Sequence, residues 1–204
     1  MSLRLRKGGM VRDEWVGTSE TDPIPVDFLP DDEVGTPGRL GMTFAPGMWA
    51  GSVRGRWERD LAADMRALEE EHEADVLVSL MEDHEYRGYR ISDLLEQESI
   101  GNIKILRFAI KDMGVPQEAE SEGFEAFVGD VVQRMKQGQN VVVHCRGGLG
   151  RTGTLAACVL VALGCHTADE AIATVREARK GTMQTREQED FVRLFEETVR
   201  TRGN

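Results

Sequence analysis

The amino-acid sequence predicts an α/β fold, with helices layered on a buried sheet, from about residue 41 to the C-terminus. Short apolar runs of the kind found in buried strands occur at 74–81, 103–110 and 140–144. Longer stretches with apolar residues at helical spacing lie between and after these runs. This alternation of the two patterns is typical of α/β proteins.

The first half of this region opens with strand-like content at 42–49, which Pro46 interrupts. Apolar residues at helical spacing then predict a helix over 57–72, followed by the buried strand at 74–81. The next expected elements are a short helix at 91–97, the strand at 103–110 and a helix at 119–137 that ends at Gly138.

The second half begins with the strand at 140–144 and a glycine-rich turn, followed by an apolar stretch at 152–163. Thr167 to Glu170 has the form of a capping box, so a helix is expected from there to about residue 179. Thr185 to Gln188 repeats this form and predicts a last helix, which carries apolar residues on one face.

Residues 1–40 differ from the rest of the chain in composition. Residues 1–12 carry four basic residues and no acidic ones, whereas residues 13–33 carry eight acidic residues and no Lys or Arg. The stretch is also rich in proline and mostly non-periodic. We therefore expect residues 1–40 to form an extended arm or mobile tail, and residues 41–204 to form the functional domain.

Length and charge exclude several classes of function. A chain of 204 residues suits one domain with an appendage, and its net charge of −11 argues against a nucleic-acid partner or an anionic membrane surface. The longest apolar run, 155–163, is too short for a membrane span. Three cysteines, Cys145, Cys158 and Cys165, form a low and odd count, which favours a cytoplasmic protein without a disulfide framework.

The chemistry is concentrated between Val141 and Thr154, where the sequence reads VVVHCRGGLGRTGT. A buried strand ends in His144 and Cys145, a loop with three glycines follows, and Arg151 arrives where a helix should begin. Glycines allow a tight turn whose amides point inward, and a helix N-terminus adds partial positive charge. The segment therefore predicts an anion site suited to phosphate.

Within this segment the residues predict distinct roles. Arg151 can bind two phosphate oxygens through its planar guanidinium. The same donors would hold Cys145 as a thiolate, and Thr152 can donate a hydrogen bond to the sulfur. A lone cysteine at a strand end usually serves packing only. The combined spacing, strand–loop–helix order and arginine favour a nucleophile here.

The order His-Cys, five residues, Arg-Thr resembles the signature of the cysteine-dependent protein tyrosine and dual-specificity phosphatases. The sequence is most similar to the cyclin-dependent kinase-associated phosphatase branch, in the segments HCRGGLGRTG, ADEAI and MQT-x-x-Q. The resemblance implies a three-layer fold with a central, mostly parallel sheet, and catalysis without metal or cofactor. The substrate-binding residues it implies are Arg146, Gly147, Gly148, Leu149, Gly150, Arg151 and Gln188.

The family also needs an aspartic acid about thirty residues before the cysteine, to protonate the leaving group. Asp112 lies 33 residues before Cys145 and follows a predicted strand, so it is the expected general acid. Its alternative reading is a simple turn residue. The rival carboxylates are Glu118, Glu120 and Glu122, which fit an exposed first turn of a helix better.

Three further residues have roles that the resemblance implies. Gln184 is expected to place the water that hydrolyses the phosphocysteine, and Gln188 either assists it or serves only in the capping box with Thr185. His144 is expected to orient the loop by hydrogen bonding and to help keep Cys145 ionised, although a packed core histidine would look the same.

The expected reaction is hydrolysis of phosphotyrosine, and of phosphoserine or phosphothreonine, in a phosphorylated protein or peptide. Tyr86 and Tyr89 are candidates for an aromatic wall of the pocket. The alternatives are a phosphatase for a small phosphorylated metabolite or a phosphoinositide, and a phosphate-binding module without catalysis. The sequence leaves the oligomeric state open.

Overall fold

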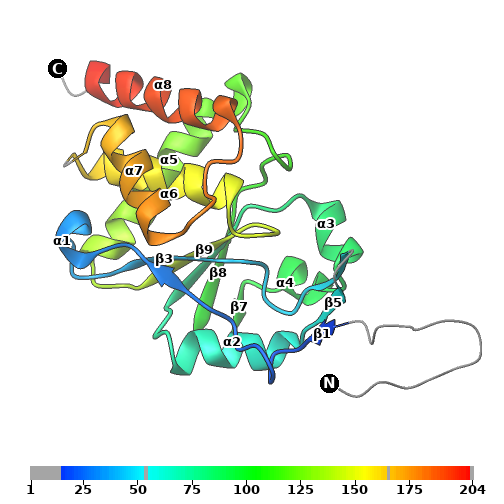
Figure 1. Ribbon diagram of the computed structural model, residues 1–204. Helices are drawn as coiled ribbons and strands as arrows, with labels where there is room; N and C mark the ends of the chain where they lie inside the picture. The colour runs from blue at the N-terminus through cyan, green and yellow to red at the C-terminus, as the bar shows by residue number, and fades with distance from the viewer. Residues whose placement is uncertain (1–14, 53–54, 165, 203–204) are drawn as a thin grey trace, which may run out of the picture.

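The computed structural model describes residues 15–52, 55–164 and 166–202. Its centre is a six-stranded sheet in the order β2-β3-β9-β6-β8-β7, covered by helices on both faces (Figure 1). The inner strands β3, β9, β6 and β8 run parallel, and each edge strand is antiparallel to its neighbour. The predicted three-layer α/β fold with a mostly parallel sheet is therefore confirmed. The strands are β2 (Asp27–Phe28), β3 (Leu40–Thr43), β6 (Val76–Ser79), β7 (Ser99–Ile100), β8 (Ile103–Arg107) and β9 (Val141–His144).

The central strands are apolar throughout because both faces of the sheet are buried. In β9, Val141 and Val143 face one core cluster, whereas Val142 faces the other. Strand β6 repeats this alternation, with Leu77 on the same side as Val142. Side chains of successive strand residues point to opposite faces, so a sheet covered on both sides needs a continuous apolar run.

Helices α5 to α8 cover one face of the sheet, and α2, α3 and α4 cover the other (Figure 1). Helix α6 is the most buried of them, since it packs against α5, α7 and α8 as well as the sheet. Its sequence is accordingly apolar on all sides. The bounds are α2 (Leu61–Glu70), α3 (Asp83–Gly88), α4 (Ser92–Glu96), α5 (Ser121–Lys136), α6 (Gly150–Leu163), α7 (Ala168–Ala178) and α8 (Arg186–Arg202).

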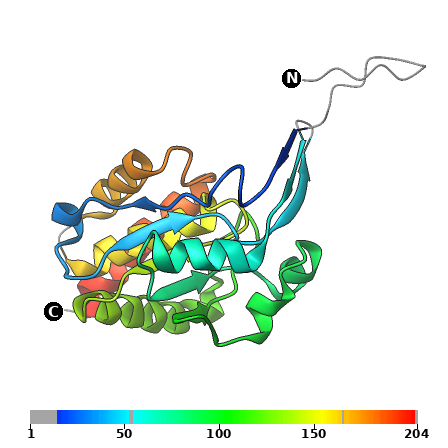
Figure 2. The same ribbon diagram turned by 90° about the horizontal axis from the view of Figure 1, so that it is seen from below.

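A second, three-stranded sheet projects from the body (Figure 2). It consists of β1 (Trp15–Gly17), β5 (Gly55–Glu58) and β4 (Trp49–Ser52), in that order. The predicted helix over 57–72 is wrong at its start, because Trp57 lies in β5. The Asp60 carboxylate accepts a hydrogen bond from the Ala63 amide (2.7 Å), so Asp60 caps the helix and α2 begins after it.

Residues 15–40, the described part of the predicted arm, lie along the body. Strand β2 pairs with β3, and the short helix α1 (Asp31–Val34) follows it. Ile24, Leu29 and Val34 are all buried. The segment thus buries more apolar surface than its proline-rich composition suggests. Residues 1–14 lie outside the described residues, and a domain boundary at residue 40 stays a prediction.

In the part of the chain that the structure describes, no helix combines the length and the apolar character needed to cross a bilayer.

Candidate active site

Cys145 lies at the carboxyl end of β9, directly before the N-terminus of α6. Its side chain is buried, and residues 146–149 form the turn between strand and helix. We call residues 145–150 the Cys145 loop. The order of strand, glycine loop and helix follows the sequence prediction, and it directs the N-terminal amides of α6 toward the loop.

The four carbonyl groups of residues 145–148 all accept hydrogen bonds from the surrounding protein. The Cys145 carbonyl accepts from Nδ1 of His144 (3.2 Å), and the Arg146 carbonyl from the Ala45 amide (3.1 Å). The next two carbonyls accept from the guanidinium of Arg179, at 3.3 Å for Gly147 and 2.7 Å for Gly148. In a trans peptide group the carbonyl and the next residue's N–H point in opposite directions. Because the four carbonyls point outward to these donors, the amides of residues 146–149 point to the opposite side, which is the arrangement of an anion-binding nest.

One position in the Cys145 loop requires glycine, and a second is closely packed against side chains. Gly148 has φ +67°, and a Cβ there would lie 2.1 Å from the Thr43 carbonyl oxygen. A Cβ on Gly150 would lie 2.7 Å from Nε2 of Gln188 and 2.9 Å from Oε1 of Gln184. The loop therefore fits against the end of β3 on one side and the two glutamines on the other.

Arg151 is buried on the first turn of α6, and its guanidinium is held by several partners. Nη1 and Nη2 donate to the Glu85 carboxylate at 2.6 and 2.9 Å, and Nη1 also donates to the Ile110 carbonyl (2.9 Å). Nη2 donates to Asp112 (2.9 Å). Nε is buried and bonds to none of the described residues, so it is the nitrogen available to a ligand.

Glu85 is a member of this site that the sequence analysis missed. It lies on α3, a six-residue polar helix with no periodic apolar pattern to predict it. The one local signal is a capping box, in which the Glu82 amide donates to Glu85 (2.9 Å). Burial opposes ionisation of Glu85, but the hydrogen bonds from Arg151 and the Glu82 amide, together with the positive charge of Arg151, outweigh it and lower the pKa of the carboxyl. Burial also opposes the charge of Arg151, but its interaction with Glu85 raises the pKa of the guanidinium.

Asp112 lies on the loop after β8, and its half-exposed carboxylate reaches Arg151. Oδ1 accepts hydrogen bonds from Nη2 of Arg151 (2.9 Å) and from the Met113 amide (3.1 Å). Met113 has φ +62°, an uncommon conformation outside glycine. The structure thus brings the predicted general acid beside the predicted phosphate-binding arginine. The rivals Glu118, Glu120 and Glu122 lie on exposed first turns before and in α5.

Gln184 and Gln188 both lie next to the Cys145 loop, but their amide groups are used differently. Gln188 is buried, and its Oε1 accepts from the amides of Gln184 (2.9 Å) and Thr185 (3.3 Å). Its own amide donates to Oγ1 of Thr185 (3.2 Å), which confirms the capping box. Its Nε2 donates to the Gly114 carbonyl (3.3 Å) and so ties α8 to the Asp112 loop. Gln184 is exposed, with its Oε1 facing Gly150.

His144 is completely buried, and burial lowers its pKa to about 4. It is therefore neutral at pH 7, and because a carbonyl oxygen can only accept, its Nδ1 carries the hydrogen and donates the bond to the Cys145 carbonyl oxygen. This geometry fits the expected orienting role, but a neutral ring supplies no positive charge to ionise the sulfur. The expected bond from Thr152 to the sulfur is not formed either, since Thr152 Oγ1 is buried without a hydrogen bond to the described residues.

The other cysteines lie away from this chemistry. Cys158 is packed inside α6, where burial raises the pKa of its thiol, as expected for a packing residue. Cys165 lies outside the described residues. Across the described ranges, no group of three or more His, Cys, Asp or Glu side chains is placed to hold a metal ion.

Comparison with known proteins places this geometry in a family. Residues 45–192 match the family described as PTP-SAK, the Swiss Army Knife protein, DSP-PTPase phosphatase domain. The chain is 28% identical over 189 residues to cyclin-dependent kinase inhibitor 3 of Rattus norvegicus, which covers 92% of this chain and 85% of that protein. It is 42% identical over 93 residues to protein tyrosine phosphatase domain-containing protein 1 of Mus musculus, covering 46% of this chain and 12% of that longer protein.

Solved structures agree with this assignment. A kinase associated phosphatase with its catalytic-site cysteine substituted by serine has a TM-score of 0.76 at 25% identity, covering 88% of this chain and 97% of the other. The active form of Tk-PTP has a TM-score of 0.58 at 26% identity, covering 78% and 92%. The family match spans well over half of the chain, from the loop between β3 and β4 to the first half of α8. The chain therefore belongs to the PTP-SAK family of dual-specificity phosphatase domains and is a cysteine-dependent protein phosphatase.

Proposed function

We propose that this phosphatase hydrolyses phosphomonoesters on proteins in two steps, with Cys145 as the nucleophile. In the first step the Cys145 thiolate forms a bond to phosphorus, the bond to the leaving oxygen breaks, and Asp112 gives that oxygen its proton. In the second step a water placed by Gln184 attacks the phosphocysteine, Asp112 takes the water's proton, and the thiolate leaves. The convergence of the Cys145 loop, Arg151 and Asp112 is the observation that carries this proposal.

Electrostatic stabilisation would come from groups that are already in place. The donors available to a phosphoryl group on Cys145 are the amides of residues 146–149, whose peptide groups are oriented by bonds to their carbonyls, and the buried Nε of Arg151. Donors fixed in this way act on the charge of the transferring phosphoryl group without reorganising during the reaction. No metal or cofactor is needed for this route.

The substrate class follows from what lies around the loop. The loop interior lacks the lysines expected for an inositol phosphate, which favours a phosphoprotein. The names of two similar proteins, a cyclin-dependent kinase inhibitor and a kinase associated phosphatase, support the same choice. Tyr86 is fully buried and bonds to Ser79 (2.6 Å), so Tyr89, whose ring lies 5.4 Å from the Arg146 guanidinium, is the better aromatic wall.

A substrate panel tests the proposal. Wild type should hydrolyse para-nitrophenyl phosphate in the presence of a chelator, and vanadate should inhibit it. The Cys145→Ser variant should have no turnover but should still bind a phosphotyrosine, phosphoserine or phosphothreonine peptide. A marked preference for a phosphoinositide or a phosphometabolite would favour the alternative substrates. Phosphopeptide binding without any turnover by wild type would instead indicate a binding module. The predicted cytoplasmic location stays a prediction.

A further inference from the structure

Arg179 supports the Cys145 loop from the side opposite to the nest. It follows the last turn of α7, and its side chain is largely buried. Its Nε donates to the Gly148 carbonyl (2.7 Å) and its Nη2 to the Gly147 carbonyl (3.3 Å). These carbonyls must face outward for the next two amides to face a phosphate. One guanidinium therefore fixes the orientation of two successive peptide groups in the loop.

The third nitrogen of Arg179 is bound by the N-terminal part of the chain. Nη1 forms an ion pair and hydrogen bond with the carboxylate of Asp27, on strand β2. All three nitrogens of the planar fork thus have partners, and these fix the orientation of the fork. Because Asp27 offsets the charge of Arg179, we expect Arg179 to act on the loop mainly through its hydrogen bonds.

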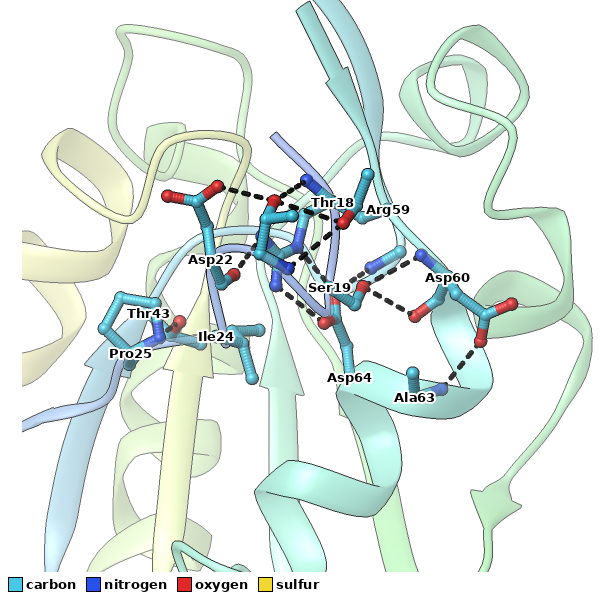
Figure 3. A network of polar contacts seen from close by, with 12 residues as sticks. Thr18, Ser19, Asp22, Ile24, Pro25, Thr43, Arg59, Asp60, Ala63 and Asp64 are labelled. Carbon is cyan, nitrogen blue, oxygen red and sulfur yellow. Dashed lines mark hydrogen bonds and ion pairs between the residues drawn. The ribbon is translucent and has the colours of Figure 1, made fainter. Parts of the chain in front are cut away.

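The segment that carries Asp27 is itself anchored near the loop. Asp27 pairs with Met42 in the register of β2 and β3, and the Thr43 hydroxyl donates to the Pro25 carbonyl (2.6 Å). Thr43 is also the residue whose carbonyl lies against Gly148. Figure 3 shows Pro25 and Thr43 side by side at the end of the sheet.

A buried ion pair extends this anchorage (Figure 3). Arg59 binds the Asp64 carboxylate at 2.8 and 2.7 Å and also donates to the Asp22 carbonyl (2.8 Å). The same carboxylate accepts from the Gly47 amide (2.8 Å), so it fixes the turn after β3. That turn supplies the Ala45 amide that bonds to the Cys145 loop. The N-terminal segment thus reaches the loop by two separate routes.

We propose that Arg179 and Asp27 are positioning residues of the phosphatase reaction, acting through the backbone of the Cys145 loop. The proposal rests on the proposed function. It makes the segment before residue 45, where the family match begins, a working part of the site rather than an appendage. Loss of the Arg179 bonds should let the peptide groups after Gly147 and Gly148 rotate, which removes amides from both the thiolate and the phosphoryl group.

The test compares Arg179→Met, Arg179→Lys and Asp27→Asn with a matched ion pair elsewhere. Arg193 and Asp169 join α8 to α7 through a 2.9 Å bond on the surface, so Arg193→Met and Asp169→Asn are the controls. Arg179→Met should lower kcat on para-nitrophenyl phosphate by roughly tenfold or more, because two hydrogen bonds to the loop are lost. Arg179→Lys should restore part of the loss, Asp27→Asn should cause a smaller one, and the controls should match wild type.

Two readouts separate positioning from simple destabilisation. The first readout is the rate at which iodoacetate alkylates Cys145, measured at several pH values on the digestion peptide that contains Cys145. In Arg179→Met the pH profile of this rate should shift to higher pH, since fewer amides stabilise the thiolate. The second readout is the kcat of the double variant Arg179→Met with Asp27→Asn. It should be no lower than that of Arg179→Met alone, because Asp27 acts through Arg179. Assays well below each variant's Tm exclude unfolding as the cause.

The failures are distinguishable. Wild type without turnover on any phosphomonoester would overturn the proposed function, and the alkylation profile would still test the role of Arg179. An active wild type together with an Arg179→Met variant of unchanged kcat and unchanged alkylation profile would overturn the inference. The same holds if kcat falls only in proportion to the unfolded fraction.

Discussion

The carboxylate of Glu85 binds the guanidinium of Arg151 through two hydrogen bonds, of 2.6 and 2.9 Å, and both side chains are buried. A bidentate pair of this kind fixes the plane of the guanidinium as well as its position. Nε is left free of protein partners among the described residues, on the edge not used by Glu85. The cation is thus oriented before any phosphate arrives.

Replacing Glu85 should therefore be costly in two ways. Glu85→Ala leaves a buried cation without its main partner, a change that typically costs about 3–5 kcal/mol of unfolding free energy. Glu85→Gln keeps the shape and one acceptor, so it should cost less stability while still lowering kcat. Urea unfolding and steady-state kinetics on para-nitrophenyl phosphate measure the two effects. A Glu85→Gln variant with wild-type kcat would contradict the orienting role.

Asp112→Ala should slow hydrolysis by roughly 10²–10⁴ on substrates with poor leaving groups, because such groups need a proton as they depart. The effect should shrink for an aryl phosphate whose leaving group is a good one. Steady-state kinetics on a phosphoserine peptide and an activated aryl phosphate make this comparison. Equal losses on both substrates would point to a role in binding through Arg151 instead.

Two alanine substitutions in the Cys145 loop should differ in severity. Gly148→Ala places a Cβ against backbone at 2.1 Å and forces alanine to φ +67°, so it should abolish activity. Gly150→Ala meets side-chain ends rather than backbone: the exposed Gln184 can move, whereas the buried Gln188 would have to weaken its hydrogen bonds. The variant should therefore still fold, with some loss of stability, and lose activity through displacement of Gln184. Circular dichroism and kcat on each variant check the order. A fully active Gly148→Ala would show that the loop is less constrained than its contacts imply.

Stability should fall as pH drops from about 6.5 toward 4, because His144 is neutral and buried in the folded state. Its pKa falls from 6.5 in the unfolded chain to about 4 in the fold, so the unfolded state binds more protons in this window. Above pH 6.5 both states are neutral and the effect vanishes. At the acid end the penalty reaches about 3 kcal/mol.

Chemical unfolding at several pH values measures this effect, and His144→Gln is the comparison. The variant should lose much of the slope between pH 6.5 and 4. Glu85, whose pKa is lowered, contributes in a separate window below about 4.5, where its ion pair is lost on protonation. An unchanged slope in His144→Gln would assign the pH dependence to other groups.

The sequence predicts the parts of the site that are close together along the chain. Cys145, the glycines and Arg151 occupy one strand–loop–helix unit, so their spacing alone indicates their geometry. Asp112 could be inferred from its place after a strand, since carboxyl ends of parallel strands meet at one edge of the sheet. The layered fold follows from periodicity, because each pattern matches a helix face or a buried strand.

Residues that act through distant contacts could not be predicted. Glu85 lies 66 positions before Arg151, and Asp27 lies 152 positions before Arg179. The capping box at Glu82 and Glu85 predicts only the start of a helix, and neither pairing has a signal of its own in the sequence, because each pair forms only once the layers have assembled. Trp57 has the spacing of the following helix, yet it packs on Trp15 with ring centroids 4.7 Å apart. There the contact between strands, rather than the periodicity, decides the structure.

The six-stranded sheet ends at both edges in strands of only two residues, β2 and β7. Such short edges offer few unpaired backbone groups to another molecule, which discourages edge-to-edge aggregation. Removing the chain before Leu40 would uncover one side of β3, a strand whose four residues are all buried. We expect such a truncation to aggregate. Substitution of Asp27 alone leaves strand β2 in place, so the effect of that substitution on turnover can be measured without aggregation of the protein.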